Sequence, residues 1–582
     1  MTQQAARAHP LLRKRGAAPG WLVAIWLLTP PVLLALSLTR PGDDVPYLLM
    51  VRQNRELIVA FLALAALTVL PLGPRVARLR LSNRGLGGIA LALALAAWAG
   101  HHALLAGYDL SRDEQMASFD AAIYGAGRLA WPLPALWQRQ TAPLNMLFML
   151  PIDRPVAWVS AYLPGNAMLR ALFARLGDAA LTGAALNAAS MLLLWGCAKR
   201  IWPGADERSA EPRVVAVLLL ALSPQFVVTG MTAFAMSAHL ACNLLWLWLF
   251  LRDSRAGDGA AIAVGAFATG LHQPLFHPLF VAPFLVLLWH ERRWRRLALF
   301  TAAYAAIAGF WLAWPEVTRM LVSGPHSALA SNAGGAGYGA RLRDALASNH
   351  DNVAIMAANL LHFIVWQHVL LLPLLAAGVL AARRAPLAAA LAAGFAAPVV
   401  AMTLLMPPQG HGMGYRYLHG VLGNAALLGG YGWCWLAPFH ARLRPLLLRA
   451  SLATALVLLP LDGWLTHALY AAYARTDARI AASGADYIVL GEDDVPLALD
   501  LVLNRPDLSN RPLRLDADQI DDADALGAAI CGKRAVMALP ADSFYADVLR
   551  WSRLPPRGHA DARLAEFGAA FGAAGCKVRV LR

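Results

Sequence analysis

Long apolar runs without charged side chains constrain this chain more than any other feature. The run from about Leu86 to Ala106 contains no Asp, Glu, Lys or Arg. An α-helix needs about 20 such residues to cross a hydrocarbon core of roughly 30 Å. Similar runs lie near residues 21–38 and 56–73 and recur as far as about residue 469. We therefore predict a polytopic α-helical membrane protein with about 13 transmembrane helices.

The composition excludes an ordinary soluble protein. Apolar residues make up 59% of the chain and charged residues 15%, whereas soluble domains carry about 25% charged residues. Acidic and basic side chains nearly balance after residue 470, so the formal net charge of +15 arises in the apolar part. Arginines in short connections between spans are a topology signal, and we expect no nucleic-acid partner.

The distribution of these arginines predicts the orientation. Arg13-Lys-Arg15 precede the first apolar run, which continues past Pro30-Pro31 with no small-residue cleavage site, and this is typical of an uncleaved span. Residues 1–20 are then a cytoplasmic tail, and residues 21–469 form the membrane domain. We expect large outer loops at 108–178 and 315–353, and a C-terminal domain outside the membrane.

Residues 470–582 have a soluble pattern. Short β-rich runs near 486–491, 511–515, 534–539 and 577–581 alternate with helical patterns near 496–503, 524–530 and 560–573. This rhythm predicts a small parallel α/β domain. It contains no glycine-rich phosphate loop.

Two cysteines of this domain occupy matching positions, each at the end of a helix and just before a strand. If the strands that follow Cys531 and Cys576 are parallel neighbours, both thiols lie at one edge of the sheet. Disulfides persist outside the cytoplasm. We predict a disulfide between them.

The apolar run to Ala106 leads into a polar stretch that contains Ser111-Arg-Asp-Glu114. A carboxylate at a membrane exit can take a proton from an incoming hydroxyl, which makes Asp113 and Glu114 candidates for general-base chemistry. The same four residues also fit the S-x-x-E capping box of a helix start. Both interpretations are open at this point.

The rest of the 108–178 loop is rich in tryptophan and proline, which favours helices along the interface. It ends in Tyr162-Leu-Pro-Gly-Asn166, the first of three further outer clusters. The others are Gly270–Pro278 and Gln409–His419. Each cluster also has a simple structural explanation. Tyr162–Asn166 can be a turn before a span, Gly270–Pro278 a tight hairpin, and Arg416 of the third cluster an arginine that snorkels to the membrane interface.

Because the three clusters fall on the same side as Asp113, we predict that they bind substrate. The arginine fork suits phosphate oxygens. The candidate substrate-binding residues are Tyr162, His272, Gln273, His411, Tyr415, Arg416 and Tyr417. No cofactor is indicated, although Asp113 and Glu114 could ligate a divalent metal.

Together these features resemble the GT-C membrane glycosyltransferases, closest to the branch of protein O-mannosyltransferases and bacterial aminoarabinose transferases (glycosyltransferase family 39-like). The acidic pair, the Tyr-x-Pro-Gly turn and the Tyr-Arg-Tyr loop carry the resemblance over about residues 86–440. It implies an inverting transfer of a sugar from a polyprenyl-phosphate donor to a lipid, glycan or protein acceptor, at the outer face of a bacterial inner (plasma) membrane. In that case Asp113 is the base, Glu114 supports it, and Arg416 contacts the donor phosphate.

A membrane transporter or lipid flippase is the alternative, and a sensor or scaffold that uses the outer domain is a third. Transporters usually place ionisable residues and broken helices near the membrane midplane. Here the polar clusters fall at the outer ends of spans. This position favours the enzyme.

Overall fold

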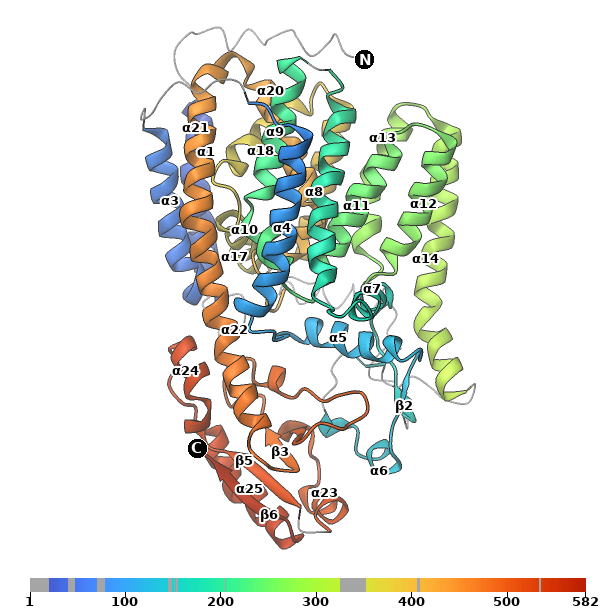
Figure 1. Cartoon of the computed structure of the whole chain (residues 1–582), viewed down its shortest axis with the longest axis vertical. Helices are drawn as coiled ribbons and strands as arrows, with labels where there is room; N and C mark the ends of the chain where they lie inside the picture. The colour runs from blue at the N-terminus through green and yellow to red at the C-terminus, as the bar shows by residue number, and fades with distance from the viewer. Residues whose placement is uncertain are drawn as a thin grey trace.

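The structure is a computed structural model that describes residues 20–39, 48–70, 79–144, 149–150, 152, 155–204, 206–324, 352–405, 409–532 and 535–582. A tall helical bundle stands above a smaller α/β unit, and a short helix, α5, lies across the boundary between them (Figure 1). The expected cytoplasmic tail falls outside the described residues except for Gly20, where α1 begins.

Within the described residues, six helical stretches are long and apolar enough to cross a membrane. They are α1 (Gly20–Ser37), α4 (Asn83–Ala103), α8 (Leu181–Ile201), α14 (Trp294–Ser323), α19 (Pro386–Leu405) and the continuous stretch Ala441–Ala481. Shorter helices complete the bundle: α3 (Arg55–Val69), α9 (Glu207–Ala221), α10 (Pro224–Thr229), α11 (Met236–Phe250), α12 (Arg255–Thr269), α13 (Phe276–His290), α17 (Asn352–Val365), α18 (Leu371–Ala381) and α20 (Leu422–Trp435). The chain is thus a multi-pass membrane protein, while the count of about 13 spans stays a prediction.

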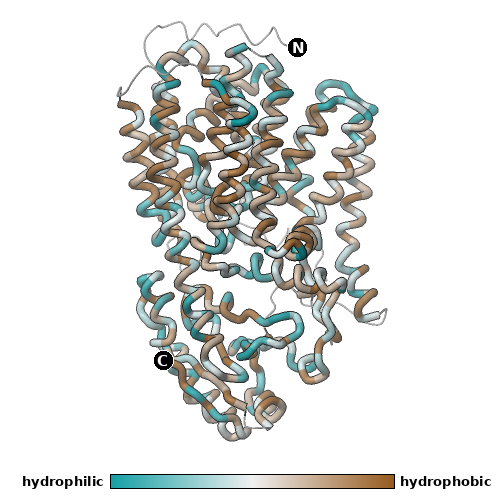
Figure 2. The backbone as a smooth tube through the Cα atoms, viewed as in Figure 1, coloured by the Kyte–Doolittle hydropathy of each residue, from teal (hydrophilic) through white to brown (hydrophobic). Residues whose placement is uncertain are grey.

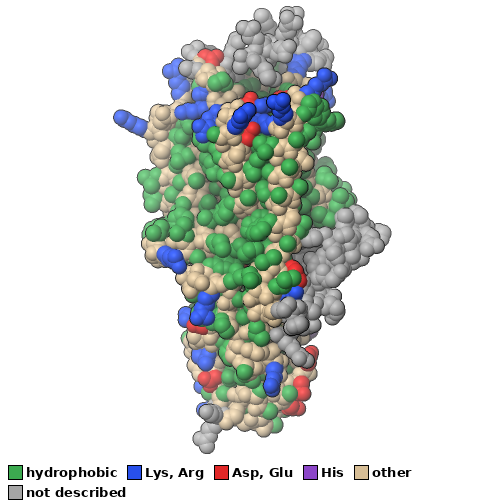
Figure 3. Space-filling view, turned by 90° about the vertical axis from the view of Figure 1, so that its right-hand side faces the viewer, with side chains coloured by type: hydrophobic (Ala, Val, Ile, Leu, Met, Phe, Trp, Pro, Cys, Tyr) green, Lys and Arg blue, Asp and Glu red, His purple; other side chains and the backbone are tan. Residues whose placement is uncertain are grey.

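Hydropathy and charge divide the molecule along its long axis. The bundle is largely apolar, and polar segments gather at its ends and in the lower unit (Figure 2). On the face shown in Figure 3, lysine and arginine side chains crowd the end of the bundle near the N-terminus, and the middle is almost free of charge. Such a band is the pattern of a membrane-spanning bundle with one strongly basic end.

The segment after α4 contains the short helices expected for the first outer loop. It begins with α5 (Arg112–Gly125) and ends with α7 (Gly165–Ala174), and both lie across the lower end of the bundle (Figure 1). Between them β1 (Trp131–Pro132) pairs antiparallel with β2 (Ala157–Trp158), and α6 (Ala135–Gln138) follows β1. This segment places the acidic residues of α5 directly under the bundle.

The expectation for the second outer loop needs correction. The loop was expected to begin at residue 315, but α14 continues through Pro315 to Ser323. A proline removes one amide donor without always ending a helix, and here the Thr318 hydroxyl bonds the carbonyl oxygens of Trp314 and Pro315. Residues 325–351, most of the expected loop, lie outside the described residues.

The four expected C-terminal strands are confirmed. They form a parallel sheet in the order β4-β3-β5-β6. Their bounds are β3 (Tyr487–Leu490), β4 (Leu513–Asp516), β5 (Val536–Pro540) and β6 (Lys577–Leu581). The helices are α23 (Ala523–Ile530), α24 (Ala546–Ser552) and α25 (His559–Ala573), whereas the pattern near 496–503 forms only the 3₁₀ turn η9 (Ala498–Leu501).

The predicted disulfide is also confirmed. Cys531 and Cys576 are bonded, with their Cα atoms 4.7 Å apart. They follow α23 and α25 and precede the neighbouring parallel strands β5 and β6. This is the arrangement that the strand-helix rhythm predicts.

The junction between the two units is a helix. The change in composition at residue 470 falls inside α22 (Leu459–Ala481), which runs from the bundle into the lower unit (Figure 1). One apolar cluster joins Phe119 and Trp158 of the outer segment to Leu513 and Leu515 of β4. The C-terminal unit is therefore packed against the outer segment.

Candidate active site

The start of α5 is fixed by a capping box. The Ser111 hydroxyl accepts a hydrogen bond from the Glu114 amide at 3.3 Å, and Glu114 Oε2 accepts one from the Ser111 amide at 3.1 Å. This confirms the capping interpretation of the S-x-x-E motif. The cap sets the direction in which the next side chain, Asp113, leaves the helix.

Glu114 does more than close the cap. Its side chain is fully buried, and it also accepts hydrogen bonds from the Tyr470 hydroxyl at 2.9 Å and from the Ala233 amide at 3.3 Å. Burial, and to a smaller extent the nearby Asp109 carboxylate, raise the pKa of Glu114 to about 8. The hydrogen bonds from these donors act in the opposite direction but do not outweigh burial. Glu114 thus bonds other groups than Asp113 does, and it lines neither of the two cavities described below. Any support that Glu114 gives to Asp113 in catalysis is therefore indirect.

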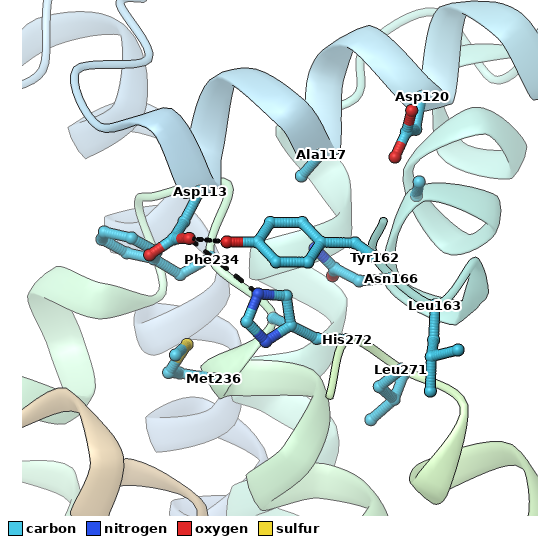
Figure 4. A pocket seen from close by; sticks show the side chains of 12 residues that line it. Asp113, Ala117, Asp120, Tyr162, Leu163, Asn166, Phe234, Met236, Leu271 and His272 are labelled. Carbon is cyan, nitrogen blue, oxygen red and sulfur yellow. Dashed lines mark hydrogen bonds and ion pairs between the residues drawn. The ribbon is translucent and has the colours of Figure 1, made fainter. Parts of the chain in front are cut away.

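Asp113 is the meeting point of the three outer clusters. Its carboxylate forms an ion pair with Arg416 and accepts a hydrogen bond from the Tyr162 hydroxyl. Nε2 of His272 lies 4.0 Å from Asp113 Oδ1 (Figure 4). Segments separated by up to 303 residues in the sequence therefore meet at one carboxylate.

These partners decide the charge of Asp113. Burial acts to raise the pKa of its carboxyl, but Arg416, His272 and the Tyr162 hydroxyl outweigh burial and lower it. Burial lowers the pKa of His272 to about 4 despite the neighbouring Asp113. Asp113 is therefore ionised and His272 neutral at neutral pH.

The first cavity at this point, here called the carboxylate cavity, lies between α5, the turn before α7 and the loop after α12 (Figure 4). Its polar lining comes from Asp113, Asp120, Tyr162, Asn166 and His272, and its apolar lining from Ala117, Leu163, Ala167, Phe234, Ala235, Met236 and Leu271. The loop after α12 has this shape because Gly270 and Pro274 end the helix.

The adjoining arginine cavity shares Met236 with the first. It is lined by Met236, His239, Asn243, Phe276, Pro398, Arg416, Tyr417, Gly420 and Val421. The Arg416 guanidinium lies over the rings of Phe234 and Tyr417, 5.2 and 5.3 Å from their centroids. Its Nε has no hydrogen-bond partner among the described residues, so this N–H group, beside the ion pair to Asp113, is available to bind a ligand.

Three predicted substrate-binding residues line neither cavity. His411 Nε2 lies 2.5 Å from Asp500 Oδ2 and so joins its loop to the C-terminal unit. Tyr415 is fully buried, and its carbonyl accepts from the Gln225 side chain at 2.9 Å. Gln273 is partly exposed beside His272. Substrate binding by His411, Tyr415 and Gln273 therefore stays a prediction, and none of the three contributes to the lining of these two cavities.

Asp120 is the main residue that the sequence analysis missed. It lies two helical turns after Asp113, and this spacing of seven places both carboxylates on one face of α5. That spacing was a readable signal. Asn166, His239 and Asn243 were missed as well, and their places in the cavities depend on tertiary packing.

The structure also bears on the residues proposed as metal ligands. In the described part of the chain, no group of three or more His, Cys, Asp and Glu side chains could hold a metal ion. The carboxylates of Asp113 and Glu114 point to different partners, as described above. They do not form a two-carboxylate ligand set.

No protein-family model and no curated protein matches the sequence. Similar solved structures include ArnT from Cupriavidus metallidurans bound to undecaprenyl phosphate, 14% identical, covering 73% of this chain and 86% of that one, with a TM-score of 0.45. The arabinofuranosyltransferase AftD from Mycobacteria is 16% identical over 72% of this chain and 30% of its own, with a TM-score of 0.35. The oligosaccharyltransferase AglB from Archaeoglobus fulgidus, with an inhibitory peptide and a dolichol-phosphate, is 12% identical over 84% and 64%, with a TM-score of 0.38. At TM-scores below 0.5 we base the function on the site itself.

Proposed function

We propose that this protein is an inverting membrane glycosyltransferase that moves a sugar from a polyprenyl-phosphate donor to an acceptor at the outer face of the membrane. One observation carries the proposal: a buried carboxylate, Asp113, joins an arginine-lined cavity to a second polar cavity at the end of the bundle. General-base transfer needs a positioned carboxylate next to a group that holds the leaving phosphate. The resemblance of the acidic, Tyr-x-Pro-Gly and Tyr-Arg-Tyr motifs to GT-C enzymes supports the same activity.

In this mechanism Arg416 holds the donor phosphate and Asp113 is the base. The acceptor hydroxyl attacks the anomeric carbon while Asp113 takes its proton. The bond between that carbon and the phosphate oxygen breaks, and polyprenyl phosphate leaves with the bonding electrons. Attack opposite the leaving group inverts the anomeric carbon. Glu114, held by Ser111 and Tyr470, positions α5.

The ion pair between Arg416 and Asp113 makes the base depend on the donor. While Arg416 binds the carboxylate, it lowers the pKa of Asp113 and weakens it as a base. A phosphate competes for the same guanidinium, which grips phosphate oxygens in bidentate fashion. Donor binding then draws Arg416 from Asp113 and raises the pKa of the carboxylate before the acceptor reacts.

The charge distribution supports the orientation. Lysine and arginine side chains gather at the end of the bundle opposite the site (Figure 3), and basic connections stay in the cytoplasm. The site, the C-terminal unit and its disulfide then lie in the periplasm or outside a bacterial inner membrane, with the N-terminus inside and about 13 spans between. A transporter or flippase is less well supported, because the charged groups of the site lie at a bundle end.

Binding of polyprenyl phosphate to the purified protein in lipid nanodiscs tests the proposal. We expect Arg416→Ala and Arg416→Lys to weaken binding, because both lose the bidentate fork, by about 10-fold or more. Arg175→Ala is the matched control, since Arg175 is an exposed arginine of the outer segment whose side chain donates a hydrogen bond to the Gly125 carbonyl. Equal binding by wild type and both Arg416 variants contradicts the assignment.

A further inference from the structure

A second buried carboxylate faces the carboxylate cavity and has no part in the mechanism above. Asp120 is 3% exposed and lines the cavity with Asp113. The two residues are seven positions apart, which corresponds to about 10 Å along α5. Figure 4 shows them at two ends of the cavity, with Tyr162 between.

Among the residues that the structure describes, Asp120 has no cationic partner to explain its burial. None of the ion pairs found among the described residues includes it, and its interactions are burial and a hydrogen bond with the Ser160 hydroxyl. A buried carboxylate is costly unless several donors satisfy its oxygens. One hydroxyl leaves acceptor capacity on Asp120 for a group within the cavity.

The opposite wall of the carboxylate cavity contains a second side chain that is available for hydrogen bonding, His272. Neither ring nitrogen of His272 has a hydrogen-bond partner among the described residues, although the residue is only 8% exposed. A neutral imidazole offers one donor and one acceptor. Three polar side chains, Asp113, Asp120 and His272, thus border a small cavity that also has an apolar wall around Met236 and Leu271. Polar edges and apolar faces are the two surfaces of a monosaccharide.

The position of the carboxylate cavity indicates which ligand it binds. It adjoins the arginine cavity at Met236 and at the Asp113–Arg416 ion pair. A sugar that is covalently joined to a phosphate on Arg416 therefore lies within reach of it.

We propose that the carboxylate cavity binds the sugar of the donor, and that Asp120 is a specificity-determining residue that accepts hydrogen bonds from sugar hydroxyl groups on the side away from the phosphate. The inference rests on the proposed function. It names the subsite in which one sugar is distinguished from another.

The test compares the binding of bare polyprenyl phosphate with that of polyprenyl phosphates carrying mannose, glucose, galactose or arabinose, in nanodiscs. For wild type we expect at least one glycosylated lipid to bind more tightly than the bare lipid. Asp120→Ala should weaken binding of that glycosylated lipid by about 10-fold, and Asp120→Asn should weaken it less. The affinity for the bare lipid should be unchanged in both variants. Asp178→Asn is the matched control, because Asp178 is an outer carboxylate that bonds Trp98 and His102 far from the cavity lining.

The other outcomes separate the two proposals. If the sugar increment survives in both Asp120 variants, or if Asp120→Ala weakens bare and glycosylated lipids equally, the subsite assignment is overturned while the glycosyltransferase proposal stands. If wild type binds none of the lipids, the proposed function fails. Elution of each variant as a single species in size-exclusion chromatography establishes that it is folded, and Asp120→Glu tests whether charge without the right reach restores the increment.

Discussion

The smallest decisive unit of this protein is one carboxylate. Asp113 receives the Arg416 guanidinium and the Tyr162 hydroxyl, and its neighbour Glu114 receives three other donors. Two adjacent acidic residues therefore have different environments because a helix points consecutive side chains about 100° apart. Their substitution should give different phenotypes.

Asp113→Asn should abolish sugar transfer without unfolding the protein. The amide cannot accept the proton of the acceptor hydroxyl, and loss of a general base costs about 10²–10⁴-fold in turnover. Transfer of labelled sugar by purified protein in nanodiscs measures this, with Asp178→Asn as the control for the same change at another outer carboxylate. Near-normal turnover by a folded Asp113→Asn protein contradicts the role of the base.

Asp120 should make stability depend on pH. Burial raises the pKa of Asp120 from 3.8 to about 7, so the folded state holds a proton that the unfolded chain has released between about pH 4 and pH 7. Stability supplied by this group is complete below about pH 4 and falls as pH rises to about 7. The melting temperature of wild type relative to Asp120→Asn should therefore decrease across that window and level off above it. Parallel curves for the two proteins contradict this assignment.

At the scale of elements, α5 is positioned from both of its sides. Its N-terminal cap closes through Ser111, while Glu114 also reaches α22 at Tyr470 and the chain between α10 and α11 at Ala233. The angle of α5 under the bundle thus depends on contacts between segments that are remote in sequence.

Above about pH 8, where Glu114 is ionised, Glu114→Gln should destabilise the protein by about 1–3 kcal/mol, because the new amide turns a donor toward buried donors. Ser111→Ala removes the cap alone and should cost about 0.5–2 kcal/mol. Thermal unfolding in detergent compares the two. Donor binding by the folded Glu114→Gln protein should remain, and a variant that is as stable as wild type but inactive would return Glu114 to a catalytic role.

The sequence predicts the features that depend on local patterns, but not the contacts between residues that are far apart along the chain. Strand alternation and the Cys531 and Cys576 positions are local patterns, and both gave the correct sheet. Asp113, Tyr162, His272 and Arg416 were found because they lie in polar clusters on one side of the spans. The partners of Glu114 and His411 were not readable, since Tyr470 and Asp500 are 356 and 89 residues away. The boundary at residue 470 stays a prediction, and the change in composition falls inside α22.

At the scale of the molecule, the C-terminal unit is fastened to the site by a buried polar contact. Asp500 pairs with His411 and lies 3.7 Å from Arg112 Nε, and its carbonyl accepts from Gln115 at 2.6 Å. Arg112 and Gln115 flank the acidic pair on α5. The C-terminal unit therefore holds the start of α5, the helix that carries Asp113.

Asp500→Ala should loosen this unit from the bundle. Removing one partner of a buried charged contact typically costs about 3–5 kcal/mol. We expect faster proteolysis of the C-terminal unit in the variant and slower sugar transfer. Asp547→Ala is the control, because its pair with Arg475 is exposed and should contribute little. Equal proteolysis of wild type and Asp500→Ala contradicts the fastening role.

The helical stretch from Ala441 to Ala481 continues through one π-helical turn at Thr454–Leu458, and under the proposed function its length bears on which acceptors reach Asp113. At 1.5 Å per residue its 41 residues extend about 60 Å, roughly twice the thickness of a hydrocarbon core. In the proposed orientation this stretch holds the sheet beyond the lipid, and α5 lies between the sheet and the bundle (Figure 1). Under the proposed function we then expect acceptors to approach Asp113 sideways, along the membrane surface. We expect transfer rates to fall steeply with acceptor thickness, so that lipid-linked or extended acceptors react and bulky folded ones do not.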